Sequence, residues 1–125
     1  MGKRSEIDDA LNAWAGWLAT LRLPLVNEKQ TQAALENALV KSGRAFEREV
    51  RLSRRDIVDF AVSDGIIIEL KSNAASGRAI ERQLTRYADH DRVKGLVLLT
   101  NRAVALPRSI QGKPLRVVAL GGAHL

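Results

Sequence analysis

The stretch at residues 56–72, DIVDFAVSDGIIIELKS, decides the fold that the sequence predicts. Two runs of β-branched and aromatic residues flank the turn-forming triplet SDG, which is typical of an antiparallel hairpin. Asp59 interrupts the first run, and Glu69 and Lys71 interrupt the end of the second. A lone charge in a buried strand costs on the order of several kcal/mol unless it is paired or bound to a cation. The three charges therefore indicate either an ion-paired cluster or a cation site.

The register of this hairpin determines which of the charges meet. Alternation along a strand places Glu69 and Lys71 on one face and Leu70 on the other. A two-residue turn within SDG would set Asp59 opposite Leu70, whereas a shift of one residue would set it beside Glu69. We expect a bulge or a longer turn that produces the second arrangement.

The flanking sequence predicts the other elements. Apolar residues at helical spacing predict helices over 5–22, 27–42 and 78–91, with Pro24 ending the first, Asn27 capping the second and Gly43 stopping it. Strands are predicted over 44–52, 56–62, 66–71, 94–101 and about 115–121, while 103–110 is ambiguous. This order predicts one α/β domain, residues 1–125, whose mixed central sheet has helices on both faces.

Composition and charge limit the classes of function. The chain has 125 residues, no cysteine and a net charge of +6, so neither disulfides nor a zinc–thiolate site can form. No apolar run approaches the roughly 18 residues that span a bilayer, and acids interrupt the N-terminal segment where a secretory signal would be apolar. We therefore expect a cytoplasmic protein with no membrane partner. Six basic residues between Lys41 and Arg55, against two glutamates, favour a polyanion such as nucleic acid.

Two carboxylates beside a lysine suit a hard divalent cation. Mg²⁺ prefers oxygen ligands, and one or two carboxylates are its usual protein ligands next to a phosphate. The alternative is a partly exposed ion pair on an edge strand.

The pattern Val58-Asp59, nine residues, then Glu69-Leu70-Lys71 resembles the PD-(D/E)XK nuclease signature. The order of helix, three strands, helix and strand over about 27–101 resembles the core of that superfamily, with an extra N-terminal helix. The resemblance implies a restriction-endonuclease-like fold. Val58 stands where the family name has proline, a position that varies widely among its members.

Two further features extend the resemblance. The stretch QLTRY, Gln83 to Tyr87, is similar to the Q-x3-Y motif of RecB-like members, and both side chains share one helical face. Glu28 with Gln32 resembles the opening of virus-type replication-repair nuclease modules. Glu36, eight residues after Glu28, is an alternative acid on the same helix, although Glu28 is favoured. The acid that is not the ligand is interpreted as a helix-dipole partner or a solvated surface residue.

The resemblance implies metal-assisted hydrolysis of DNA phosphodiester bonds. Asp59, Glu69 and the Leu70 carbonyl would hold Mg²⁺, for which Mn²⁺ would substitute, with Glu28 reaching the ion and Gln83 supporting it. Lys71 would orient the attacking water. The predicted contacts to the DNA backbone are Arg44, Arg48, Arg51, Arg54, Arg55, Arg78, Arg82, Arg86 and Tyr87.

Other interpretations remain open at this stage. The alternative function is a non-catalytic nucleic-acid-binding or interaction module that keeps the nuclease fold. Trp14 and Trp17 on the first helix indicate either a homodimer contact or packing on the chain's own sheet. His90, within DHDR, is interpreted as part of a solvated helix end. Asp56 and Asp64 are interpreted as strand-start and turn residues.

Overall fold

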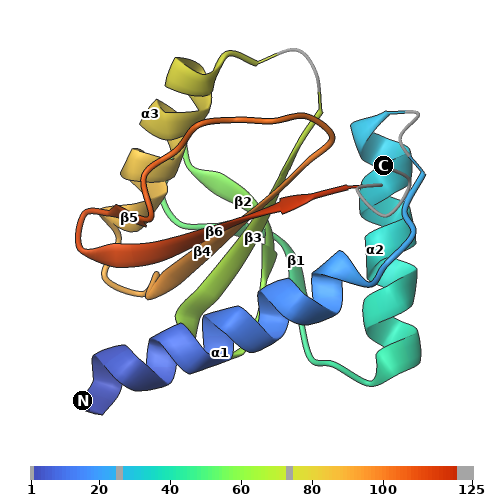
Figure 1. Cartoon of the computed structure of the whole chain (residues 1–125), viewed down its shortest axis with the longest axis horizontal. Helices are drawn as coiled ribbons and strands as arrows, with labels where there is room; N and C mark the ends of the chain where they lie inside the picture. The colour runs from blue at the N-terminus through green and yellow to red at the C-terminus, as the bar shows by residue number, and fades with distance from the viewer. Residues whose placement is uncertain (1, 25–26, 73–74, 121–125) are drawn as a thin grey trace.

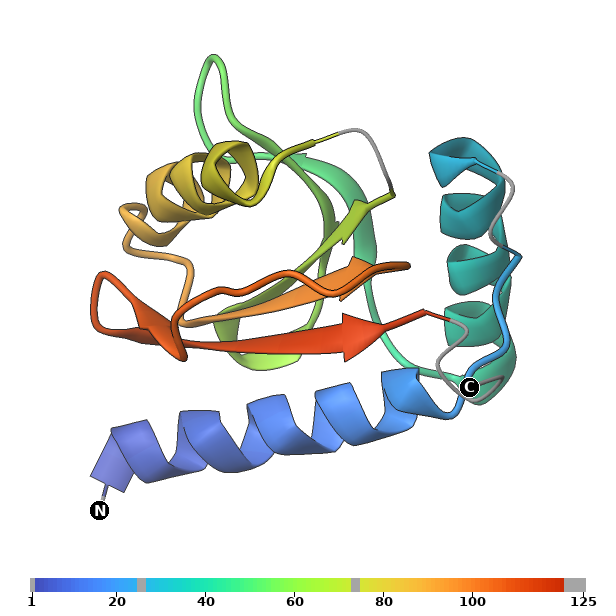
Figure 2. The same cartoon turned by 45° about the horizontal axis from the view of Figure 1, so that its top comes forward.

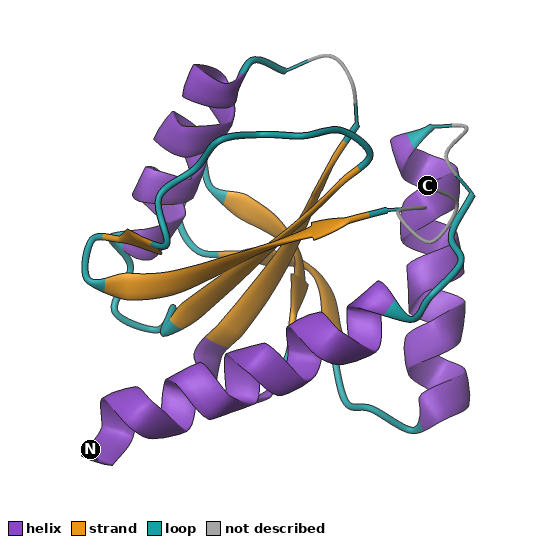
Figure 3. Ribbon diagram, viewed as in Figure 1, coloured by secondary structure: helices purple, strands orange, loops and turns teal. Residues whose placement is uncertain are grey.

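The computed structural model describes residues 2–24, 27–72 and 75–120, with side chains from residue 6 onward (Figure 1). It is an α/β structure in which three α-helices surround a mixed six-stranded sheet (Figure 3). The elements are α1 (Gly2–Ala19), α2 (Glu28–Ser42), β1 (Glu47–Arg51), β2 (Ile57–Ala61), β3 (Ile66–Lys71), α3 (Gly77–Ala88), β4 (Gly95–Thr100), β5 (Ser109–Ile110) and β6 (Lys113–Ala119).

The sheet has the strand order β1-β2-β3-β4-β6-β5. The first three strands form an antiparallel meander, whereas β3, β4 and β6 run parallel to one another. β4 is buried along its whole length, as its continuous apolar run predicts. The predicted mixed sheet is therefore confirmed, and the ambiguous residues 103–110 contain only the two-residue strand β5, which pairs with β6 at one edge.

Helices cover both faces of the sheet, as predicted (Figure 2). Leu11 and Leu18 of α1 and Leu35 and Leu39 of α2 join one buried cluster with residues of β2, β3, β4 and β6. On the opposite face, α3 contributes a second cluster through Ile80, Leu84, Tyr87 and Ala88. Each face thus has its own apolar core, and the central strands β3 and β4 contribute to both.

The chain itself covers the apolar face of α1. Leu11 and Leu18 are buried against the sheet, and the Arg116 Nε of β6 donates to Asn12 Oδ1 at 2.8 Å. Trp14 and Trp17 are half-buried and meet edge to face, with 5.9 Å between ring centroids. Packing on the chain's own sheet therefore accounts for this face, and α1 needs no second copy to bury it.

Several helix and strand ends differ from the predicted ones. α1 begins at Gly2 and ends at Ala19, a turn before Pro24, because Thr20 closes the helix by donating its hydroxyl to the Trp17 carbonyl at 2.6 Å. α3 ends at Ala88 rather than at residue 91. β6 begins earlier, at Lys113, and ends at Ala119, and residue 121 of the predicted strand lies outside the described residues. The predicted cap Asn27 and stop Gly43 of α2 are confirmed.

The turn between β2 and β3 sets the hairpin register. Ser63–Gly65 form a three-residue turn in which Asp64 and Gly65 both have positive φ, and the Val62 amide donates to the Ile66 carbonyl at 2.9 Å across its base. Phe60 consequently pairs with Ile68, which is one residue away from the register of a two-residue turn. The predicted longer turn is confirmed, and it brings Asp59 level with Glu69.

Gly65 is required in this turn. Its φ of +74° is strained for other residues, and a Cβ there would lie 2.5 Å from Lys94 Cγ and 2.9 Å from the Arg92 carbonyl oxygen. The Gly65 carbonyl also accepts the Lys94 amide at 2.7 Å. The turn is therefore fixed against the loop that leads into β4.

Candidate functional site

Two carboxylates replace the backbone ladder where β2 and β3 separate. Beyond the pair of Phe60 and Ile68, the Asp59 amide donates to Glu69 Oε1 at 3.1 Å, and the Leu70 amide donates to Asp59 Oδ2 at 2.8 Å. Each acid thus accepts the backbone N–H of the strand opposite. This reciprocal exchange holds the two side chains next to each other between the strands, as the predicted register requires.

Burial opposes the ionisation of both acids. Glu69 is 3% exposed. Its burial, and then the charge of Asp59, raise the pKa of Glu69 to about 8, although the Asp59 amide and Lys71 act in the opposite direction. Burial also raises the pKa of Asp59, against the hydrogen bond from the Leu70 amide and the charge of Lys71. Two negative charges at this position are therefore unfavourable without a compensating proton or cation.

Lys71 lies beside the pair, on the same strand face as Glu69. Its Nζ is 3.6 Å from Glu69 Oε2, and its side chain is partly open to solvent. Lys71 is thus a partly exposed neighbour of the buried Glu69.

Tyr87 supports Glu69 from the interior. It is 1% exposed, and its hydroxyl lies 3.1 Å from the Ile57 carbonyl oxygen and 3.5 Å from Glu69 Oε2. The predicted contact of Tyr87 with DNA is therefore wrong, because α3 packs this ring into the core. Gln83 lies one helical turn earlier on the same side of α3 and is half-buried, and no hydrogen bond of its side chain occurs among the described residues.

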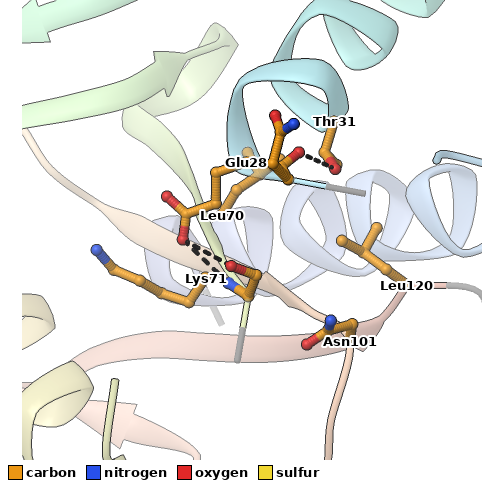
Figure 4. Close-up of a pocket in the computed structure, with 8 residues that line it drawn as sticks. Glu28, Thr31, Leu70, Lys71, Asn101 and Leu120 are labelled. Atoms are coloured by element: carbon orange, nitrogen blue, oxygen red, sulfur yellow. Dashed lines mark hydrogen bonds between the residues drawn. The ribbon is translucent and has the colours of Figure 1, made fainter. Parts of the chain in front are cut away.

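Glu28 reaches from the start of α2 to the end of β3 (Figure 4). Asn27 caps this helix, which places Glu28 in its first turn, and Glu28 Oε1 accepts the Ser72 amide at 3.0 Å and the Ser72 hydroxyl at 3.4 Å. The negative charge of Glu28 also contributes to the raised pKa of Asp59. A shallow pocket at this point is lined by Asn27, Glu28, Thr31, Leu70, Lys71, Ser72, Asn101 and Leu120.

Glu36, the alternative helix acid, is committed elsewhere. Arg48 Nη1 donates to Glu36 Oε1 at 2.8 Å, and Arg48 Nη2 donates to Gln32 Oε1 at 3.0 Å. The Arg48 guanidinium also lies over the Phe60 ring, 5.2 Å from its centroid. Of the two predicted glutamates, only Glu28 contacts the end of β3, and Arg48 fastens α2 to the sheet.

Apart from Arg54, whose side chain is exposed in the loop after β1, the predicted DNA-contacting arginines separate into two groups. The Arg44 guanidinium stacks 4.0 Å from the Trp17 ring centroid, and Arg51 Nη1 donates to the Arg54 carbonyl at 2.8 Å within the loop after β1. Together with Arg48, these side chains make contacts that stabilise the fold. The other group lines one groove between that loop and α3, and its residues are Arg55, Arg78, Arg82 and Arg86.

Asp56 and His90 form a buried polar contact that the sequence does not predict. Asp56 is 5% exposed. Its Oδ1 accepts a hydrogen bond from Arg86 Nε at 3.1 Å, and its Oδ2 lies 3.0 Å from His90 Nε2. The hydrogen bond to His90, followed by the contacts with Arg86, lowers the pKa of Asp56 against its burial. Asp56 stands directly before β2, which agrees with its interpretation as a strand-start residue. The interpretation of His90 as part of a solvated helix end is wrong, because its ring is partly buried against Asp56. Nothing in the local pattern indicates a contact between residues so far apart in sequence.

The acids do not form a ready-made metal cage. Within residues 2–24, 27–72 and 75–120, no group of three or more His, Cys, Asp or Glu side chains is arranged to hold a metal ion.

Among the helices that the structure describes, none is both long and apolar enough to cross a membrane. Comparison with protein-family models, with curated proteins and with solved structures finds no match for the chain.

Proposed function

We propose that the chain is a Mg²⁺-dependent nuclease that hydrolyses DNA phosphodiester bonds, with a restriction-endonuclease-like core. The order α2, β1 to β3, α3 and β4 agrees with the order that the resemblance implies. The observation that carries the proposal is the meeting of Glu28, Asp59, Glu69 and Lys71. Asp59 and Glu69 each accept an amide of the opposite strand where β2 and β3 separate, and Lys71 Nζ lies 3.6 Å from Glu69 Oε2. Glu28 reaches the end of β3 from α2 by accepting the Ser72 amide.

A plain structural role explains this group poorly. Two buried acids with raised pKa values, next to a third carboxylate, destabilise a fold that has no cation for them. One lysine at 3.6 Å from Glu69 does not balance three carboxylates. Strained or unfavourable electrostatics of this kind occur most often at functional sites.

The chemistry of the donor set fits a divalent cation. Asp59, Glu69 and Glu28 supply hard oxygen ligands, and a cation would replace the proton that the buried pair otherwise needs. Asp59 Oδ2 and Glu69 Oε1 accept backbone amides, and these amides orient the two carboxylates. The Leu70 carbonyl stays the proposed further ligand. Bound Mg²⁺ would act as a Lewis acid on the phosphate.

The protein's own residues have distinct proposed roles. The Lys71 ammonium, partly open to solvent, would hold the attacking water and offset charge that develops on the phosphate. Tyr87 would keep Glu69 in position through its hydroxyl. Gln83, on the same side of α3 as Tyr87, would contact the substrate or the water around the ion.

The test is cleavage of labelled single-stranded, duplex and branched DNA with Mg²⁺, Mn²⁺ or EDTA. We expect metal-dependent cutting that falls by about a hundredfold or more in Asp59→Ala and Lys71→Ala, because each removes a group that acts on the transition state. Lys41→Ala is the matched control, since Lys41 is an exposed lysine at the end of α2. Cleavage that survives both site substitutions would refute the assignment of this site.

A calorimetric titration with Mn²⁺ gives a second readout that does not depend on activity. Glu28→Gln should weaken Mn²⁺ binding, whereas Glu36→Gln should not, because Glu36 is bound by Arg48 away from the end of β3. Equal losses in both variants would contradict the placement of Glu28. Tight DNA binding without cleavage of any substrate would favour the alternative function, a non-catalytic nucleic-acid-binding module.

A further inference from the structure

A groove between α3 and the loop after β1 concentrates positive charge on one side of the molecule. Figure 2 shows this loop beside α3. Arg78, Arg82 and Arg86 follow one another at four-residue spacing, so each lies about 6 Å further along the helix than the last. The six side chains that line the groove are Arg55, Arg78, Glu81, Arg82, Thr85 and Arg86.

Three of these arginines have side chains with no ion-pair or hydrogen-bond partner among the described residues. Throughout the described part of the chain, Arg55, Arg78 and Arg82 form no salt bridge and no side-chain hydrogen bond. Glu81, although it shares the groove, is not within ion-pair distance of any of them. Unpaired guanidinium groups around one groove repel one another and add nothing to folding. Their arrangement suits an extended anion.

The lining also indicates which part of a nucleic acid it fits. It contains no aromatic side chain on which a base could stack and no amide side chain that would read a base edge. Guanidinium groups instead bind phosphate oxygens in a bidentate manner. The groove therefore suits the sugar–phosphate backbone and carries no sequence information.

Consecutive residues of α3 connect this groove with the carboxylates. Arg86, at the edge of the groove, binds Asp56, and Tyr87 contacts Ile57 and Glu69. Asp56 and Ile57 are in turn the residues that lead into β2, which carries Asp59. A strand bound in the groove would thus lie on the α3 side of the sheet, the side from which Tyr87 reaches Glu69.

We propose that this groove binds the phosphate backbone of a DNA strand through Arg55, Arg78 and Arg82, and that DNA approaches the carboxylates along α3. The proposal rests on the proposed function for the identity of the anion. Arg86 has a different task, because its bond to buried Asp56 fastens α3 to the loop. Arg44, Arg48 and Arg51 lie outside the groove.

The test is fluorescence anisotropy of labelled oligonucleotides, single-stranded in one arm and duplex in the other, in EDTA so that no strand is cut. The double variant Arg78→Ala/Arg82→Ala should weaken binding roughly tenfold, and the slope of log K against log salt should fall by about 0.7–0.9 for each lost phosphate contact. The arm with the larger change identifies the strand form that the groove accepts. Glu81→Gln should tighten binding, because it removes the only acid of the groove lining.

The matched control is Arg22→Ala/Lys41→Ala, which removes two exposed basic residues from the α1 and α2 side of the sheet, opposite α3, and changes the net charge equally. An equal loss of affinity in both double variants, or no loss in the groove variant, would overturn the proposal. The outcome is independent of catalysis. Groove-dependent binding without any cleavage would contradict the proposed function alone, and cleavage with unchanged binding in the groove variant would contradict the groove alone.

Discussion

Glu69→Gln should stabilise the metal-free protein at alkaline pH. The pKa of Glu69 rises from 4.5 in the unfolded chain to about 8 in the folded one, chiefly because the group is buried. The folded state therefore holds a proton that the unfolded state has released. Its stabilising contribution is complete below pH 4.5 and disappears as the pH rises through about 8. The amide of glutamine carries no charge and removes this dependence.

The size of the effect follows from the shift. Each pKa unit corresponds to about 1.4 kcal/mol, so the full shift sets an upper limit of roughly 5 kcal/mol above pH 8. Because the effective dielectric constant of real proteins is higher than that of a dry interior, we expect about half of that limit. The glutamine oxygen can still accept the Asp59 amide, which keeps the main hydrogen bond of the position.

The assay is urea unfolding in EDTA at several pH values from 5 to 8.5, followed by circular dichroism. The free energy of unfolding should fall with pH more steeply in the wild type than in Glu69→Gln, and the variant should be the more stable protein at the alkaline end. Glu6→Gln, at an exposed position of α1, is the control and should follow the wild type. Parallel pH profiles of wild type and Glu69→Gln would refute the argument that burial of this acid opposes its ionisation.

Two further predictions concern the fold around the site. Asp56→Asn should lower the free energy of unfolding by about 2 kcal/mol, because it leaves Arg86 without its buried carboxylate. The pKa of Asp56 lies below 3.8, so urea unfolding should show this loss at neutral pH and a smaller loss as the pH falls below that value. An unchanged free energy of unfolding at pH 7 would contradict the prediction. Gly65→Ala should lower the free energy of unfolding by about 2 kcal/mol or more, because the residue has a positive φ and its new Cβ would clash with the Arg92 carbonyl. The control is Gly16→Ala, where a Cβ meets nothing and should stabilise α1. Thermal unfolding of the two variants measures both effects, and equal melting temperatures would be inconsistent with a strained turn.

Local patterns predict the elements of this chain because each element carries its own periodicity. The alternation of residues 56–72 predicts the hairpin, and the position of Asp59 relative to Glu69 indicates the longer turn that the structure has. The end of α1 is predicted less well, because Thr20 closes the helix with its own hydroxyl before Pro24 is reached. Helix ends depend on single hydrogen bonds that periodicity does not report.

The candidate site is predicted only where its members are close in sequence. Asp59, Glu69 and Lys71 belong to one hairpin, so strand alternation and the length of its turn together place them side by side. The choice between Glu28 and Glu36 depends on how α2 lies against β3, and the sequence leaves it open. Contacts such as that of Asp56 with His90 depend on where α3 crosses the sheet, which no local pattern encodes.

The reciprocal hydrogen bonds between the strands give this protein two natural spectroscopic probes. The amide protons of Asp59 and Leu70 point at carboxylate oxygens instead of backbone carbonyls. Their NMR chemical shifts should therefore respond first when a proton or a cation reaches those oxygens, while neighbouring amides of the same strands stay unchanged. Events at the acids can thus be followed through the backbone, without a label, a substrate or a change of sequence.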